Sequence, residues 1–199
     1  MILKDPATES TPGNDDANAL ADLYGFFALC MRYPDPAFLD QKFLTTFQDL
    51  LHSLGRDSQA RETGTWLEQD SNPLETLQIE YTRLFINAIP HAIAPPYASI
   101  YIGGAGSLQG KITEETRDFY RQCGFDLTDE TEPADHIMHE LEFLAQLTRE
   151  GRLEEAEEFL HRFFRPWFER FYQRVHNEAG HLFYRVSVEL IDFFTKEEP

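Results

Sequence analysis

Apolar residues recur every three or four positions along most of this chain, which is the spacing of helices that bury one face. In the first such stretch, Leu20, Leu23, Tyr24 and Phe27 share one stripe, and Pro34 follows shortly afterwards. No stretch of useful length alternates apolar and polar residues as a half-buried strand would. The pattern therefore predicts an all-α bundle of about nine to eleven helices, expected over residues 17–32, 36–54, 59–69, 73–85, 113–123, 133–150 and, in two or three pieces, 153–196.

Several predicted helix ends carry residue types that start or stop helices. Asn72 precedes Pro73, and Glu75 stands three residues after Asn72, which is typical of a capped first turn. Gly124 and Gly151 follow two other helices, and glycine commonly takes the left-handed position just beyond a helix end. The remaining boundaries are two expected helix starts and two expected breaks, at Thr113, Pro133, Pro166 and Gly180.

One long segment, residues 84–110, contains no Asp, Glu, Lys or Arg. Its length suits a membrane span, but prolines and glycines interrupt it, and such a backbone could not satisfy its hydrogen bonds in lipid. We expect a Pro/Gly-rich loop and no membrane span. Residues 1–17 are rich in small and polar residues, so a disordered tail is expected there. Residues 18–199 are expected to form a single all-helical domain, with a larger part to about residue 125 and a smaller part over 131–199.

The chain is strongly acidic, with 35 Asp and Glu against 17 Lys and Arg and a formal net charge of −18. This charge disfavours nucleic acid and bare membrane as partners and favours a cationic partner such as an arginine-bearing peptide. Acidity that only aids solubility is the alternative. Cys30 and Cys123 match no paired motif and are expected to stay reduced, and no signal peptide is evident, so a cytoplasmic location is expected.

A polar cluster around residues 132–142 could carry chemistry. His136, His139 and Glu142 could hold a metal ion, although their spacing is not the His-Glu-x-x-His pattern of zinc hydrolases. The same residues could form a solvated helix face. A third interpretation is that Asp135 and His136, side by side at a helix start, anchor a polar ligand.

A second group combines aromatic rings with prolines. Tyr81, Leu84 and Phe85 end a predicted helix, and Pro96 and Tyr97 lie just beyond it. Rings beside prolines make a rigid apolar surface that could receive a peptide side chain at low entropic cost. Alternatively, these side chains only hold the loop against the bundle.

Taken in order, three segments resemble the TorD/DmsD/NarJ family of redox-enzyme maturation chaperones, and the TorD/DmsD branch most closely. They are Glu80–Phe85, Pro95–Tyr101 and Glu132–His136, and the aromatic residues from Phe163 to Phe171 also agree. The resemblance implies an all-helical cytoplasmic chaperone that is not an enzyme and has no cofactor of its own. Its implied partners are the twin-arginine leader and the catalytic subunit of a molybdopterin oxidoreductase, which it holds during cofactor insertion before export. Weak guanine-nucleotide binding, and a monomer or helix-swapped dimer, are also implied.

The family's peptide-site positions correspond here to seven residues: Tyr81, Leu84, Phe85, Pro96, Tyr97, Asp135 and His136. The hypothesis is that the leader arginines meet Asp135 and Glu132 while its apolar stretch packs on the rings and prolines. It requires the loop and the Asp135–His136 pair to converge. Two alternatives from other classes are a metal-dependent hydrolase that uses His136, His139 and Glu142, and a helical scaffold that only bridges other proteins.

Overall fold

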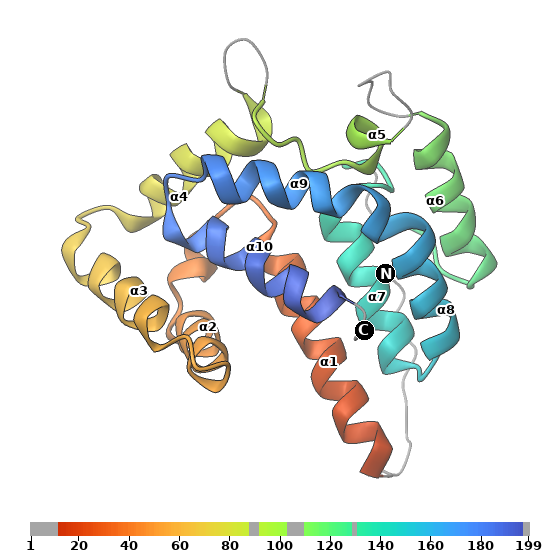
Figure 1. The fold of residues 1–199 in the computed structure, drawn as a ribbon, viewed down its shortest axis with the longest axis horizontal. Helices are drawn as coiled ribbons and strands as arrows, with labels where there is room; N and C mark the ends of the chain where they lie inside the picture. Colours follow the sequence, from red (N-terminus) through yellow and green to blue (C-terminus); the bar gives the residue numbers. More distant parts are fainter. Residues whose placement is uncertain (1–11, 88–91, 103–109, 129–130, 197–199) are drawn as a thin grey trace. The chain divides into compact units, whose positions relative to one another are not determined.

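The computed structural model describes residues 12–87, 92–102, 110–128 and 131–196 (Figure 1). Within these residues the chain is helical and contains no strand. The all-α prediction is confirmed. The helices are α1 (Pro12–Cys30), α2 (Gln41–Ser53), α3 (Asp57–Gln69), α4 (Pro73–Tyr81), α5 (Ala98–Tyr101), α6 (Lys111–Gln122), α7 (Ile137–Arg149), α8 (Leu153–Phe159), α9 (Arg165–Glu178) and α10 (Leu182–Thr195).

Three further helical turns accompany these helices. A 3₁₀ turn, η1 (Pro36–Leu39), precedes α2, and two π turns, η2 (Thr82–Ile86) and η3 (Leu160–Phe164), extend α4 and α8. The change of element expected near Pro166 is present, because α8 and η3 end at Phe164 and α9 begins at Arg165. Because Pro166 has no backbone N–H, it cannot continue the regular hydrogen-bond pattern of the helical turn before it.

The chain folds into two compact units, each built from separate segments. The first unit comprises Met1–Met31, Pro96–Phe171 and Phe194–Pro199, and the second comprises Arg32–Pro95 and Tyr172–Phe193. These units interleave along the sequence, so they differ from the sequential division expected near residue 125. Residues 1–11 lie outside the described residues, and helix α1 already begins at Pro12.

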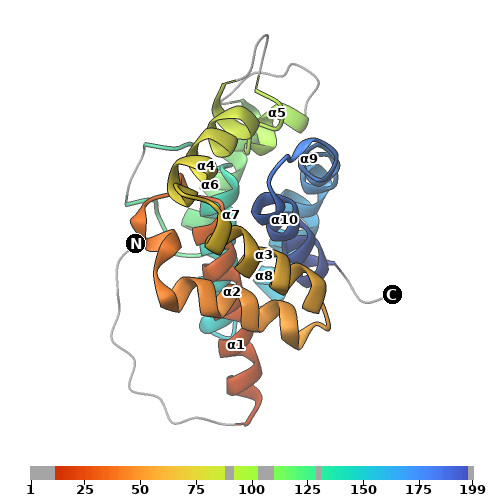
Figure 2. The ribbon, with the colours of Figure 1, turned by 90° about the vertical axis from the view of Figure 1, so that its left-hand side faces the viewer.

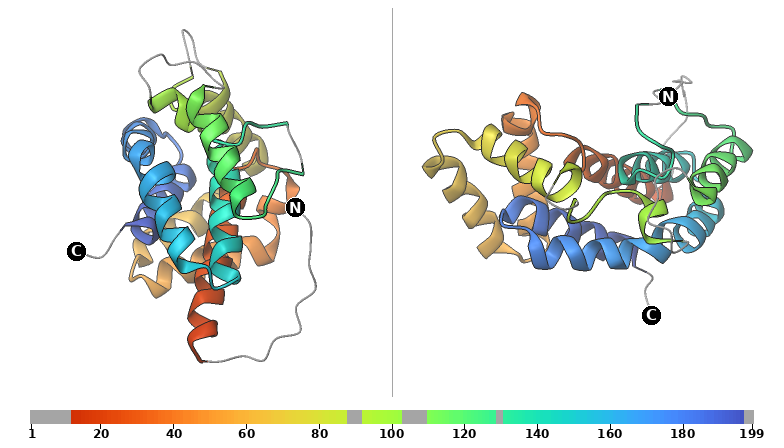
Figure 3. Two further views of the ribbon diagram at one scale, coloured as in Figure 1. Left: turned by 90° about the vertical axis from the view of Figure 1, so that its right-hand side faces the viewer. Right: turned by 90° about the horizontal axis from the view of Figure 1, so that it is seen from above.

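In the first unit, α1 packs along α7, and α7 packs against α8. Figure 3 shows α6, α7 and α8 together in the green to cyan part of the chain. One ring from each of these helices meets the others: the ring centroids of Phe119 and Phe143 are 6.1 Å apart, and those of Phe143 and Phe159 are 4.9 Å apart. Trp167, Phe168 and Phe171 are fully buried in the same unit. The aromatic C-terminal region of the sequence is therefore core.

In the second unit, α2 and α3 lie side by side (Figure 2). Gly55 sits between them at a φ of +70°, and the nitrogen of Arg56 donates to the oxygen of Leu51. Phe183 of α10 contacts the rings of Phe38, with centroids 5.9 Å apart, and of Phe47, with centroids 5.1 Å apart.

Gly124 and Gly151 end their helices as predicted, at φ values of +82° and +71°. After Gly124, the nitrogen of Phe125 donates to the oxygen of Tyr120, which closes the last turn of α6. The predicted start of α6 at Thr113 was two residues late, because the helix begins at Lys111. Among the described residues, no helix combines the length and the apolar character needed to cross a bilayer.

Candidate functional site

Two segments far apart in the sequence pair by backbone hydrogen bonds in the first unit. The nitrogen of Ala98 donates to the oxygen of Asp135 at 3.0 Å, and the nitrogen of Ile137 donates to the oxygen of Pro96 at 2.9 Å. Tyr97 and His136 form an antiparallel bridge between these bonds. Residues 96–98 of the Pro/Gly-rich loop and the acid–imidazole pair, Asp135 and His136, therefore lie directly beside each other, as the sequence hypothesis required.

The side chain of Asp135 is wholly buried and points at the start of α5. Its Oδ2 atom accepts a hydrogen bond from the nitrogen of Ser99 at 2.8 Å. A carboxylate there satisfies an otherwise unpaired donor of the first helical turn. Its other oxygen, Oδ1, is buried without a hydrogen-bond partner among the described residues. Asp135 thus holds α5, and in this conformation it presents no carboxylate to solvent.

His136 caps the next helix. Its Nδ1 atom accepts a hydrogen bond from the nitrogen of Met138 at 3.1 Å, at the start of α7. The ring is almost completely buried, and the edge of the Tyr97 ring meets it with centroids 5.0 Å apart. Burial, with the neighbouring His139 as a lesser cause, lowers the pKa of His136 to about 3. The ring is therefore neutral at physiological pH, as an acceptor at a helix start must be.

Tyr97 and Glu132 are the partly exposed members of this site. The hydroxyl of Tyr97 donates to Oε2 of Glu132 at 2.8 Å. This bond places a carboxylate at the rim of an aromatic ring, an arrangement suited to a cation with an apolar body.

Glu140, which the sequence hypothesis missed, lies buried on α7. Its Oε2 accepts a hydrogen bond from Nε1 of Trp167 at 3.0 Å. Burial, reinforced by the charge of Asp135, raises the pKa of Glu140 well above its usual range. A signal was present, because Glu140 stands three residues after Ile137 and four before Leu144, on the apolar face of the helix.

Tyr81, Leu84 and Phe85 belong to the second unit and are buried there. The rings of Tyr81 and Phe85 meet edge-on at 4.8 Å, and Tyr184 contacts both. The oxygen of Leu84 accepts a hydrogen bond from the nitrogen of Ala94 at 2.8 Å. The three side chains are core of the second unit, and the backbone of Leu84 holds Ala94 of the loop.

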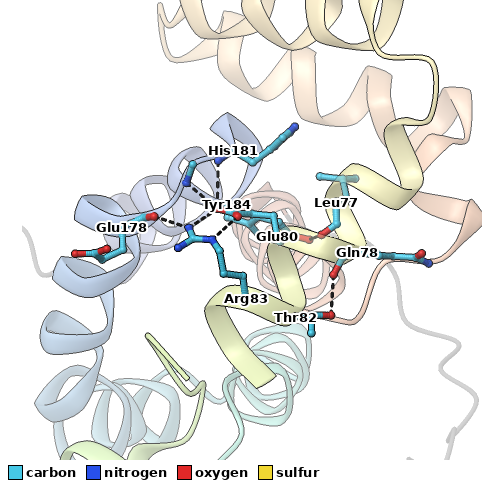
Figure 4. Close-up of polar contacts among 9 residues, drawn as sticks. Leu77, Gln78, Glu80, Thr82, Arg83, Glu178, His181 and Tyr184 are labelled. Atoms are coloured by element: carbon cyan, nitrogen blue, oxygen red, sulfur yellow. Dashed lines mark hydrogen bonds and ion pairs between the residues drawn. The ribbon is translucent and has the colours of Figure 1, made fainter. Parts of the chain in front are cut away.

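Glu80 joins α4 to the turn between α9 and α10 (Figure 4). Its carboxylate accepts from the nitrogen of Gly180 at 2.7 Å and from both Nε and Nη2 of Arg83, at 2.7 and 2.8 Å. Arg83 also donates to the oxygen of Glu178 at 2.6 Å. Burial raises the pKa of Glu80, but the hydrogen bonds from Arg83 and Gly180 outweigh burial and leave the pKa below its usual range.

The residues proposed for a metal site are not arranged as one. Nδ1 of His139 lies 3.8 Å from Oε2 of Glu142, while His136 caps α7. Across the described parts of the chain, no group of three or more His, Cys, Asp or Glu side chains is placed to hold a metal ion.

The fold belongs to a known class of protein. The structure is similar to the crystal structure of a redox enzyme maturation protein from Archaeoglobus fulgidus, with a TM-score of 0.60 and 27% identity over 98% of this chain and 100% of that one. The model of the nitrate reductase delta subunit family matches residues 40–173, more than half of the chain. The chain therefore belongs to this family, which includes TorD and NarJ.

Two relatives are both chaperone proteins named TorD. The protein from Vibrio parahaemolyticus is 30% identical over 64% of this chain and 65% of its own length. The protein from Photobacterium profundum is 29% identical over 72% of this chain and 75% of its own length. The match to the first relative thus leaves about a third of that protein unmatched.

Proposed function

We propose that this protein is a cytoplasmic chaperone that binds the twin-arginine leader of a molybdopterin oxidoreductase catalytic subunit and assists cofactor insertion before export. Family membership supports a role in redox-enzyme maturation. The observation that carries the proposal is the pairing of residues 96–99 with residues 135–137, because it brings two of the family's segments beside each other in the first unit. The net charge of −18 suits a cationic leader.

The structure suggests distinct roles for the residues of this site. Tyr97 and Glu132 are partly exposed, so they are the side chains that meet the leader: the ring offers an apolar face, and the carboxylate pairs with a guanidinium. Asp135 and His136 act as positioning residues, because Asp135 holds the loop that carries Tyr97 and His136 caps α7. Pro96 fixes the backbone just before Tyr97, because its oxygen accepts a hydrogen bond from the nitrogen of Ile137.

In the second unit, Tyr81, Leu84 and Phe85 form the support for an apolar part of the leader. Tyr81 is in edge-on contact with Tyr33, with ring centroids 5.4 Å apart, and Tyr33 is half exposed. An apolar leader segment that docks on this cluster would touch Tyr33 first and the three buried side chains only after they rearrange. In this proposal the protein turns over no substrate.

Calorimetric titration of the full chain tests the proposal. A peptide with two adjacent arginines followed by an apolar stretch should bind, and the same peptide with both arginines replaced by lysine should bind at least about tenfold more weakly, because lysine lacks the planar guanidinium. Equal affinities would contradict leader recognition and favour a scaffold that senses charge alone. The same titration with a guanine nucleotide, and sedimentation of the protein alone, would check nucleotide binding and the monomer or helix-swapped dimer.

A further inference from the structure

The second unit contains a cavity of about 250 Å³ between α3 and the start of α10. Glu62, Thr63 and Trp66 line it from α3, and His181 and Phe183 line it from the opposite side. Pockets for small molecules and cofactors are commonly about 300–1,000 Å³. This cavity is smaller, so it suits a single side chain rather than a cofactor.

The aromatic wall of the cavity is held in place from several directions. The rings of Trp66 and His181 meet nearly at right angles, with centroids 4.5 Å apart. Nε1 of Trp66 donates to Oδ2 of Asp70 at 3.1 Å, and Nδ1 of His181 accepts from the nitrogen of Phe183 at 3.1 Å. Rings fixed in this way lose little entropy when a ligand packs against them.

The surroundings of the cavity are acidic. The carboxylate of Glu62 accepts a hydrogen bond from the hydroxyl of Ser58 at 3.1 Å and makes no ion pair with the rest of the described chain. Asp70 and Glu80 lie close enough to His181 for their charges to act on it, yet burial prevails and lowers the pKa of that imidazole. Arg83, the neighbouring cation, is held by Glu80. Glu62 therefore lies at the cavity without an ion-pair partner among the described residues, with the carboxylates of Asp70 and Glu80 nearby.

A helix start ordinarily attracts an anion, and α10 starts at this cavity. Here the protein supplies that anion itself, because Glu80 accepts from the nitrogens of Gly180 at 2.7 Å and His181 at 3.3 Å. The nitrogen of Phe183 is taken by the His181 ring. With these donors occupied, an anionic ligand would gain little and would be repelled by Glu62 and Glu80.

We propose that this cavity receives one arginine side chain of the client leader, with its guanidinium stacked on Trp66 and paired with Glu62. The inference rests on the proposed function and adds a second contact for arginine, in a different unit from Tyr97 and Glu132. Arginine fits better than lysine because its planar head can stack on an indole and pair with a carboxylate at the same time.

The two tryptophans make the cavity directly observable. The chain contains Trp66 and Trp167, and Trp167 is wholly buried with its Nε1 bonded to Glu140. In proton–nitrogen NMR of the full chain, titration with the paired-arginine peptide should shift the indole signal of Trp66 and leave that of Trp167 in place. Trp66→Phe assigns the signals. The paired-lysine peptide should produce a clearly smaller shift.

Two variants and one control complete the experiment. Glu62→Gln and Trp66→Leu should each weaken binding of the paired-arginine peptide about three- to tenfold. Glu68→Gln makes the same charge change on an exposed part of α3 that does not line the cavity, so it should leave affinity unchanged. Circular dichroism confirms that each variant is folded.

The outcomes separate this inference from the proposed function. Normal leader affinity in both variants, with a stationary Trp66 signal, would overturn the cavity assignment and leave the chaperone proposal intact. An equal loss in Glu68→Gln would also overturn it, since general charge would then explain the effect. If the unmodified protein does not bind the leader at all, the proposed function fails and this inference fails with it.

Discussion

The Oδ2 atom of Asp135 lies 2.8 Å from the backbone nitrogen of Ser99, inside the protein and 36 residues away along the chain. Asp135 was expected to meet a leader arginine, but in this structure its carboxylate serves the first turn of α5. Asp135→Ala should therefore lower the free energy of unfolding by about 1–3 kcal/mol, because it leaves a buried donor unsatisfied. Asp135→Asn keeps an acceptor oxygen and should lose less. Urea denaturation measures both.

Glu132→Gln is the matched comparison, since it removes an acid at the partly exposed side of the same site. It should weaken leader binding while changing stability by less than about 0.5 kcal/mol. The reversed result would be an Asp135→Ala variant that is as stable as the unmodified protein but cannot bind the leader. That result would support direct contact between Asp135 and the leader arginines.

Glu80 gives a second prediction, about the turn between α9 and α10. Glu80→Gln removes one of the two oxygens that share Arg83 and the nitrogen of Gly180, and should cost about 1–2 kcal/mol of unfolding free energy. Gly180→Ala keeps the backbone donor, and its added Cβ would lie 3.5 Å from the Glu80 carboxylate, an ordinary contact distance. Thermal unfolding should show a clear loss for the first variant and almost none for the second.

Two glycines with opposite roles give a third prediction. Gly124 has a φ of +82°, so Gly124→Ala should destabilise the protein by about 1 kcal/mol. Gly25 lies inside α1, where an added Cβ would have nothing within 4 Å, so Gly25→Ala should stabilise by about 0.5–1 kcal/mol. If chemical denaturation showed that both variants gain stability, helix propensity and not the left-handed conformation would govern both sites.

The helices with a regular apolar stripe could be predicted from the sequence because the spacing of their own residues decides them. The ends at Gly124 and Gly151 were also predictable, since a left-handed residue beyond a helix is a local requirement. The boundary near Pro166 was predictable too, because a proline cannot continue a regular helix, and α9 begins at Arg165 after a π turn.

What could not be predicted depends on contacts between distant segments. The helix expected from Pro133 begins only at Ile137, because the preceding residues pair with the loop from Pro96. Helix α5 has four residues, too few for periodicity to reveal, and it depends on Asp135 from elsewhere in the chain. For the same reason, the spacing of residues could not predict that the loop and the acid–imidazole pair lie together. That prediction came from the family resemblance.

The last prediction concerns His136 and the dependence of stability on pH. Its folded-state pKa is lowered to about 3 from an ordinary value of 6.5, so between these values the unfolded chain binds more protons than the folded one. The contribution is fully present above pH 6.5 and is lost as the pH falls toward 3. Between about pH 7 and pH 5 the loss should be about 2 kcal/mol.

His136→Asn keeps a side-chain acceptor for the nitrogen of Met138 but does not titrate. Its stability should therefore fall about 2 kcal/mol less than that of the unmodified protein between about pH 7 and pH 5. Glu140 acts in the opposite direction, because its raised pKa makes stability fall as the pH rises above its ordinary value. Since Glu140 is present in both proteins, the difference between their urea-denaturation curves isolates His136. Parallel curves would mean that the imidazole becomes protonated without leaving its place at the start of α7.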